Sequence, residues 1–140
     1  MSKKNKIGLF LGTYYHEVAM GSRVTLPSRF KVELTQNQVV MIQADEGSIL
    51  CFDAEQFVKN TQKYMQESTL ESDARLFRRN VFNNAVAVDV DEAGRFVIPE
   101  AMRKSAGINT KVVLAGMGDA FELWSQERYQ QVSAHKPGQL

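Results

Sequence analysis

An internal repeat constrains the fold of this chain more than any other feature of its 140-residue sequence. When Thr13 is aligned with Ala85, a shift of 72 positions, residues 13–57 match residues 85–129 without a gap. Substituted pairs keep their size and polarity, as Phe52 and Trp124 do. Because there are only two copies, too few for a solenoid, we expect them to pair face to face. The identical pairs are Val18/Val90, Arg23/Arg95, Pro27/Pro99, Asn37/Asn109, Val40/Val112 and Glu55/Glu127.

The second copy predicts four strands and two helices. Valines alternate with alanine or aspartate over residues 86–90, which is typical of a half-buried strand. Residues 91–94 predict a turn, because Asp can hydrogen-bond its own backbone and Gly accepts a positive φ. The expected elements are strands at 86–90, 95–98, 111–115 and 121–124, a short helix between Pro99 and Gly107, and a final helix capped by Ser125.

The first copy predicts the same elements in the same order. Asp53 begins its second helix and, with Gln56, resembles a capping box. The unit is thus β-β-α-β-β-α twice, which is a mainly β chain of the α+β class. The expected strands are 13–18, 24–26, 39–42 and 49–52, with a short helix after Pro27.

The segment between the copies predicts a helical linker. It lacks Gly and Pro, and its apolar residues Leu70, Ala74, Phe77 and Val81 have the spacing of an amphipathic helix. The expected organisation is a first repeat at 8–57, the linker at 58–82, a second repeat at 83–132 and a disordered tail at 133–140.

Charge and cysteine content limit the class of protein. The net charge is +1, from 17 basic and 16 acidic side chains, which excludes a protein that is basic throughout. An anionic partner must therefore be bound by a local cluster or by charge summed over several copies. The single cysteine, Cys51, excludes an intramolecular disulfide and fits a reducing compartment. No apolar run approaches the roughly 20 residues of a membrane span, so we expect a cytoplasmic chain without a membrane partner.

The sequence offers little for catalysis or metal binding. It has two histidines, of which His16 lies on the first strand and is expected in the core or at its rim. The carboxylates around Asp91 have no His or Cys partner that would suggest a metal site. The glycines at 116 and 118 fit a hairpin turn rather than a phosphate-binding loop. We expect no catalytic residue, no metal, no cofactor and no small-molecule substrate.

Two segments, DEAGRFVIP at 91–99 and VVLAGMGDAFELWS at 112–125, resemble the MraZ family of bacterial transcription regulators, which is related to the AbrB/SpoVT/MazE superfamily. The resemblance extends from Gly8 to Gln130 and includes the family's Asp-x-x-x-Arg motif and tandem repeat. It implies two swapped halves that form one β-barrel-like domain with pseudo-two-fold symmetry. It also implies a ring, from octamer to dodecamer, that binds G-rich direct repeats of double-stranded DNA in the promoter of the division and cell-wall gene cluster. Such a protein would be associated with the nucleoid.

The first copy departs from this motif. Asp91, Gly94 and Arg95 complete it in the second copy, whereas the first copy has Ala19, Ser22 and Arg23 at these positions. Glu17 is a candidate to replace the missing carboxylate. Whether both halves read DNA equally well stays open.

The resemblance makes Arg23 and Arg95 the candidates for reading DNA. A guanidinium matches guanine O6 and N7 bidentately, and such a pair discriminates by about 1–3 kcal/mol. Asp91 would then orient Arg95; the alternative is that the two residues only brace their own turn as an exposed ion pair. Basic residues on the two short helices either bind phosphates or form a solvated face: Arg29, Lys31, Arg103 and Lys104.

Two further points concern partners. Arg75, Arg78 and Arg79 in the linker are expected to pair with Glu71 or Asp73 or with another subunit. The rival function is a protein-interaction module of antitoxin type, without direct DNA readout. Antitoxins of this superfamily generally have one such unit and a long acidic tail, whereas this chain has two units and a short Pro-Gly tail.

Overall fold

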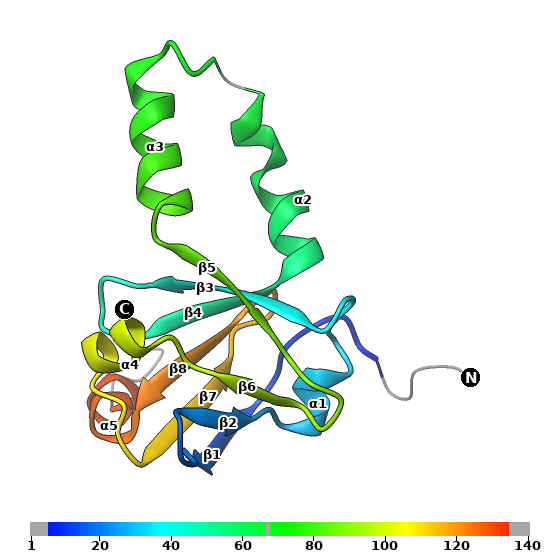
Figure 1. Ribbon diagram of the computed structural model, residues 1–140, viewed down its shortest axis with the longest axis vertical. Helices are drawn as coiled ribbons and strands as arrows, with labels where there is room; N and C mark the ends of the chain where they lie inside the picture. The colour runs from blue at the N-terminus through cyan, green and yellow to red at the C-terminus, as the bar shows by residue number, and fades with distance from the viewer. Residues whose placement is uncertain (1–5, 67, 135–140) are drawn as a thin grey trace.

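The computed structural model describes residues 6–66 and 68–134, which form eight strands and five helices. Six strands form an antiparallel sheet in the order β1-β7-β8-β4-β3-β5, and β2 and β6 form a separate two-stranded sheet (Figure 1). The strands are β1 (Thr13–Glu17), β2 (Arg23–Thr25), β3 (Gln38–Gln43), β4 (Ile49–Asp53), β5 (Ala85–Asp89), β6 (Arg95–Val97), β7 (Lys111–Gly116) and β8 (Phe121–Ser125). The helices are α1 (Ser28–Lys31), α2 (Ala54–Met65), α3 (Ser72–Phe82), α4 (Glu100–Ala106) and α5 (Gln126–Ser133). The mainly β, α+β class and the repeated β-β-α-β-β-α order are confirmed.

The two halves exchange strands. The first strand of each half pairs with the third strand of the other half: β1 pairs with β7, and β5 pairs with β3. The pairs β4–β8 and β2–β6 also join one half to the other. This arrangement confirms that the two copies pair with each other, but they do so by exchanging strands within shared sheets and not by packing one face on another, so neither half has a complete sheet of its own.

The repeat is offset by 72 positions at most elements but by 73 in one strand. Val39 of β3 lies opposite Asp53, whereas Val112 of β7 lies opposite Ser125. Asp53 and Ser125 are 72 positions apart, whereas Val39 and Val112 are 73 apart, so these two valines are the true counterparts. The gapless equivalence of Val40 with Val112 is therefore wrong by one residue. The same correction applies to Asn37/Asn109, Met41/Val113 and Ile42/Leu114.

Two differences in length explain this shift. The path from the helix-starting proline to the inner strand is one residue shorter in the first half, where α1 has four residues and α4 has seven. The turn between β3 and β4 spans 44–48, whereas the turn between β7 and β8 spans 117–120. The two differences cancel, which returns the later elements to the offset of 72.

The core lies between the two sheets. Val24 and Phe96 point inward from the two-stranded sheet and are almost fully buried. The rings of Phe10, Phe30 and Phe121 contact one another there, with centroids 5.0–5.4 Å apart. Each such buried side chain contributes about 1.5–3 kcal/mol to folding. The two-stranded sheet is therefore held by its inner face, which leaves its outer face free for solvent or a partner.

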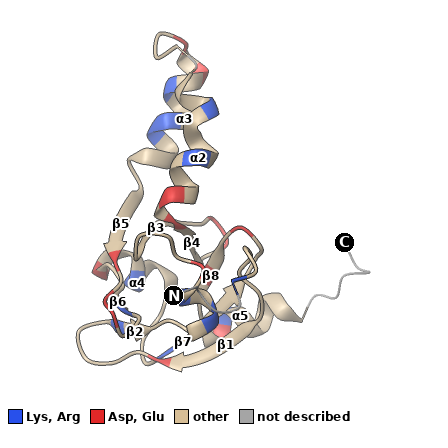
Figure 2. Ribbon diagram, turned by 90° about the vertical axis from the view of Figure 1, so that its right-hand side faces the viewer, with Lys and Arg blue, Asp and Glu red and all other residues tan. Residues whose placement is uncertain are grey.

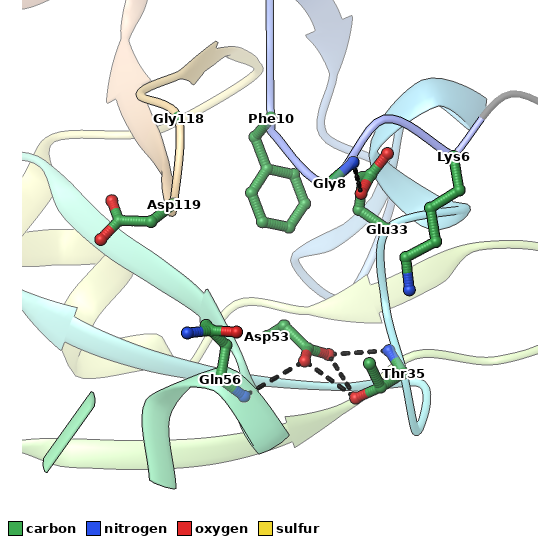
Figure 3. A pocket seen from close by; sticks show the side chains of 9 residues that line it. All are labelled: Lys6, Gly8, Phe10, Glu33, Thr35, Asp53, Gln56, Gly118 and Asp119. Atoms are coloured by element: carbon green, nitrogen blue, oxygen red, sulfur yellow. Dashed lines mark hydrogen bonds between the residues drawn. The ribbon is translucent and has the colours of Figure 1, made fainter. Parts of the chain in front are cut away.

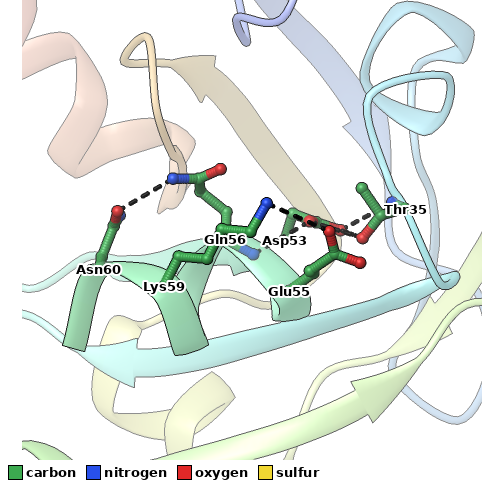
Figure 4. Close-up of polar contacts among 6 residues, drawn as sticks. All are labelled: Thr35, Asp53, Glu55, Gln56, Lys59 and Asn60. Atoms are coloured by element: carbon green, nitrogen blue, oxygen red, sulfur yellow. Dashed lines mark hydrogen bonds and ion pairs between the residues drawn. The ribbon is translucent and has the colours of Figure 1, made fainter. Parts of the chain in front are cut away.

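The predicted helix ends are confirmed where they depend on local sequence. Asp53 caps α2 by accepting from the backbone N–H of Gln56, and Ser125 caps α5 in the same way. Gly107 ends α4 with a left-handed φ of 69°. The capping box is only half formed, because the Gln56 side chain donates to Asn60 rather than returning to the backbone of Asp53 (Figure 4).

The linker forms a helical hairpin instead of one helix. Helices α2 and α3 run side by side away from the sheet (Figure 1), and the rings of Tyr64 and Phe77 stack between them at 4.0 Å. Leu70 lies before α3 and is 86% exposed, so the apolar stripe of α3 begins at Ala74 and does not include Leu70. The predicted disorder of residues 135–140 lies outside the described residues; Ser133 is the last residue of α5.

Residues before β1 form a strap that the repeat does not predict. Phe10 is 4% exposed, and its backbone exchanges hydrogen bonds of 2.7 and 3.0 Å with Gly118. The strap passes so close to β7 that a Cβ on Gly116 would lie 2.4 Å from the carbonyl oxygen of Phe10. Glycine at position 116 is thus a requirement of this close approach.

Candidate nucleic-acid interface

The two-stranded sheet presents both motif arginines on one outer face. In this ribbon Arg23 lies opposite Val97, and Thr25 lies opposite Arg95. The alternation of a strand turns these four side chains outward, while Val24 and its partner Phe96 turn into the core. The ribbon therefore carries two guanidinium groups on a rigid, well-packed base.

Asp91 holds Arg95 at two points. Its Oδ1 accepts from the backbone N–H of Arg95 at 2.8 Å, and its Oδ2 accepts from Arg95 Nε at 3.0 Å. The turn itself is closed by the N–H of Asp91 on the carbonyl of Arg95 and by the N–H of Gly94 on the carbonyl of Asp91, both at 2.9 Å. Gly94 provides the positive φ, 84°, that this turn requires. About half of each charged side chain remains exposed, so the pair lies at the surface.

These contacts set the charge of Asp91. They hold the pKa of Asp91 below its ordinary value, chiefly because the backbone N–H of Arg95 donates to the carboxylate, with a further contribution from the Arg95 side chain. Asp91 is therefore ionised at neutral pH. Its negative charge faces the Nε edge of the guanidinium, and no described residue bonds the other edge.

The turn of the first half is built differently. The backbones of Ala19 and Arg23 exchange hydrogen bonds of 2.8 and 3.3 Å, so a carbonyl replaces the carboxylate that holds Arg95. Two consecutive residues, Gly21 and Ser22, adopt positive φ values of 79° and 62°. Met20 at the tip is 94% exposed. Within the described part of the chain, the Arg23 guanidinium has no hydrogen bond or ion pair, and Glu17 therefore does not replace the missing carboxylate in this structure.

The two turns keep their symmetric attachment to the ribbon despite this difference. The carbonyl of Gly94 accepts from Leu26 N–H at 2.8 Å, and the carbonyl of Ser22 accepts from Ile98 N–H at 2.9 Å. Each turn is thus fastened to the strand of the opposite half. An open groove of about 440 Å³ follows the ribbon and is lined by both arginines together with Asp91.

The four basic residues of the short helices have different surroundings. Arg29 and Lys104 are exposed, and Lys31 is partly buried with its stem close to Gly94. Arg103 is only 19% exposed, because it forms an ion pair with Glu100 and donates to the carbonyl of residue 108 at 2.8 Å. The hydrogen bond that the Arg103 side chain donates to Glu100 lowers the pKa of that carboxyl group. Lys31 therefore lies next to the second turn, whereas the Arg103 side chain is engaged by α4 and by the residues that directly follow it.

Other charged groups serve the fold. Arg75 donates to the carbonyls of residues 69 and 70, both at 2.9 Å, and Arg78 donates to the carbonyl of Met65 at 3.0 Å. These bonds close the tip of the hairpin; the basic positions of α3 are coloured blue on the ribbon in Figure 2. His16 lies partly buried on β1 and donates from Nδ1 to the carbonyl of Thr25 at 2.6 Å, which ties β1 to the ribbon.

A second hollow, of about 230 Å³, contains buried carboxylates, but these are already bonded to the chain (Figure 3). Glu33 accepts from the backbone N–H groups of Ile7 and Gly8 at 2.9 and 2.8 Å. Asp53 accepts from Thr35 and Gln56. Across residues 6–66 and 68–134 there is no group of three or more His, Cys, Asp or Glu side chains that could hold a metal ion. In the same residues no helix has both the length and the apolar character that a membrane span needs.

Sequence reasoning identified the two arginines and missed part of their setting. It did not identify Thr25 as their neighbour on the ribbon or place the Lys31 stem at the second turn. The outward position of Thr25 follows from strand alternation beside Arg23. The contact of Lys31 with Gly94 crosses from one half to the other, and no signal in a single sequence predicts it.

Comparison with known proteins gives the family. The family model described as "MraZ protein, putative antitoxin-like" matches twice, at residues 9–80 and 81–137. "Transcriptional regulator MraZ" of Mycoplasmopsis pulmonis is 36% identical over 84% of this chain and 80% of the relative. The proteins of the same name from Oenococcus oeni and Mycoplasmoides gallisepticum are 32% and 31% identical, over 90% and 88% of this chain and 87% and 86% of the relatives. The chain therefore belongs to the MraZ family, and these relatives are named as transcriptional regulators.

Proposed function

We propose that this chain is a sequence-specific DNA-binding transcriptional regulator that binds G-rich direct repeats with Arg23 and Arg95. The observation that carries the proposal is the ribbon: two exposed guanidinium groups on one outer face, supported by a buried inner face. The major groove of B-DNA admits a two-stranded ribbon, and arginine paired with guanine is the commonest specific contact there. The names of the relatives support a role in transcription.

Phosphate contacts would come from the neighbouring basic side chains. Arg29 and Lys104 are exposed, and Lys31 lies beside the second turn. Contacts of this kind position a protein on the duplex and make its affinity depend on salt. Arg103 contributes less in this proposal, because Glu100 already engages its guanidinium.

Assembly into a ring would give this weakly charged chain sufficient affinity. One chain with a net charge of +1 attracts DNA poorly, whereas a closed ring presents each ribbon many times. Weak single contacts then add through effective concentration when the DNA repeats match the subunit spacing. We propose a ring between octamer and dodecamer on the promoter of the division and cell-wall gene cluster, and therefore an association with the nucleoid. The resemblance stated above supports this target.

The proposal is tested by binding to labelled duplexes that carry tandem G-rich repeats, followed by fluorescence anisotropy at several salt concentrations. We expect Arg23→Ala with Arg95→Ala to abolish preference for the repeats. Arg79→Gln, on the far hairpin, removes one positive charge without touching the ribbon and serves as the control. Unchanged affinity and salt slope in the double variant would refute the assignment. Mass measurement in solution tests the ring, and a monomer or dimer would contradict it.

The rival is a protein-interaction module of antitoxin type, which the description of the family model favours. The hairpin also exposes apolar side chains that a protein could cover, among them Val58, Met65 and Leu76. This function predicts a stoichiometric protein partner in a pull-down together with no preference for G-rich DNA. The binding experiment above separates the two functions.

A further inference from the structure

We infer that the two arginines have different tasks: Arg95 determines which base is read, and Arg23 supplies affinity that depends little on sequence. This inference rests on the proposed DNA-binding function and concerns the division of work within it. Its origin is the asymmetry of the two turns, since one half has a carboxylate where the other has Ala19.

The two guanidinium groups differ in how they are oriented. Asp91 binds both the backbone N–H and the Nε of Arg95, at 2.8 and 3.0 Å, so the side chain is held before any DNA arrives. Its two terminal nitrogens have no hydrogen-bond partner among residues 6–66 and 68–134, so they can donate to guanine O6 and N7. A side chain that is already ordered loses less entropy on binding, which favours a geometrically demanding contact. Arg23 has no such support among the described residues and can reach phosphates or bases in several conformations.

The two turns also differ in how closely they are packed. Gly94 is buried, and a Cβ built there would lie 3.2 Å from the Lys31 side chain, so the second turn is backed by α1. The position equivalent to Gly94 in the first turn is Ser22, and the two residues before it are open to solvent: a Cβ built on Gly21 would have nothing within 4 Å, and Met20 is 94% exposed. A backed turn presents its arginine at a fixed position, whereas an open turn can adjust to the contour of the duplex.

The two turns differ in local charge as well. Residues 91–95 contain one arginine and two carboxylates, whereas residues 19–23 contain one arginine and no carboxylate. The second turn itself is thus net negative, and Lys31, which lies beside it, is better placed than Arg95 to contact a phosphate, so Arg95 is useful mainly at a base edge. The first turn is net positive and gains from any phosphate, whatever the sequence. All three differences assign base readout to Arg95.

Lysine variants test this division because they keep the charge and lose the fork of the guanidinium. Affinities are measured for a duplex with G-rich repeats and for a shuffled duplex of equal composition. We expect Arg95→Lys to lower the ratio of the two affinities about tenfold with little effect on the shuffled duplex. We expect Arg23→Lys to change the ratio less than about twofold, and Arg23→Gln to weaken both duplexes and to reduce the salt slope by about one.

A gain-of-function variant tests the cause. The double variant Ala19→Asp with Ser22→Gly gives the first turn the residues that hold Arg95. It should raise the preference for the duplex with G-rich repeats over the shuffled duplex. Melting temperatures verify that each variant is folded, and Arg79→Gln controls for lost charge. If wild type does not distinguish the two duplexes, the proposed function and this inference both fail. If wild type does, but the two lysine variants lose equal preference, the division of tasks alone is overturned.

Discussion

Asp53 has more contacts than its counterpart in the second half, and the difference should be measurable as stability. Its carboxylate accepts from Gln56 N–H at 3.3 Å as the cap of α2, and from the backbone N–H and hydroxyl of Thr35 at 2.9 and 2.8 Å (Figure 4). Ser125 accepts from Arg128 N–H at 3.2 Å as the cap of α5. Both capping residues are 4% exposed. Alanine at 125 therefore removes a cap, whereas alanine at 53 also removes the link to the loop after α1.

The sizes of these losses follow from the contacts. Loss of a cap costs about 1 kcal/mol, and loss of a hydrogen bond to a charged group costs about 1.5–3 kcal/mol. The Thr35 hydroxyl can bind water instead, since Thr35 is exposed, so only its backbone N–H is counted. We expect Ser125→Ala to lower the free energy of unfolding by about 1 kcal/mol and Asp53→Ala by about 2.5–4 kcal/mol. Asp53→Ser keeps a cap and should cost about 1.5–3 kcal/mol.

Urea unfolding followed by the fluorescence of Trp124 provides the assay. All variants are compared at one chain concentration, because self-association would add to apparent stability. Asp45→Ala, an exposed aspartate in the turn after β3, is the matched control and should change stability by less than about 0.5 kcal/mol. Equal losses for Asp53→Ala and Ser125→Ala would refute the reasoning, because they would show that the bond to Thr35 contributes nothing.

Three further outcomes are expected. Gly116→Ala should lower the free energy of unfolding by about 1–3 kcal/mol and speed hydrogen exchange at the Phe10 amide, because the new Cβ would displace the strap; unchanged exchange would contradict this placement. The pKa of Asp91 is lower in the folded state than its ordinary 3.8. The stabilisation that the ionised Asp91 gives to the folded state is therefore complete above pH 3.8 and is lost as the pH falls through the folded pKa. The stability difference between wild type and Asp91→Asn should therefore vanish in acid, and a difference that persisted there would show that the charge is not its source. Arg128→Met should cost about 1–2 kcal/mol and expose the β3–β4 turn to proteolysis, because Arg128 donates to a carbonyl of that turn at 3.2 Å and to the carbonyl of Ser105 at 2.9 Å; normal protease resistance would argue against this role.

Features that depend on neighbouring residues could be predicted from the sequence. The caps at Asp53 and Ser125, the left-handed end of α4 at Gly107 and the outward direction of Arg95 each follow from side-chain type and strand alternation. Helix capping, left-handed helix ends and strand alternation each depend on residues within three or four positions, so a single sequence contains the information needed to predict them.

Features that depend on distant residues could not be predicted in this way. The shift at Val39 arises from two length differences that cancel, so that a gapless alignment conceals both. The break between α2 and α3 has no Gly or Pro to mark it, and the apolar spacing begins at Leu70, within the break, and continues into α3, so it does not show where the helix starts. The buried position of Phe10 is set by its contact with Gly118, more than a hundred residues later. Likewise, only the contacts in the folded chain show that Asp91 holds Arg95, whereas no described carboxylate holds Arg23.

The exchange of edge strands gives this single chain the architecture of an isologous dimer whose two subunits share one backbone. In a true homodimer both loops are encoded once, so a change that suits one loop is imposed on the other. A covalent connection through the α2–α3 hairpin removes this constraint, because each half now has its own codons. The alanine at position 19, where the second half has Asp91, and the shorter α1 are differences that such a tandem gene permits in one half alone. The common interior still requires both halves, so their loops are free to diverge while their folding remains joint.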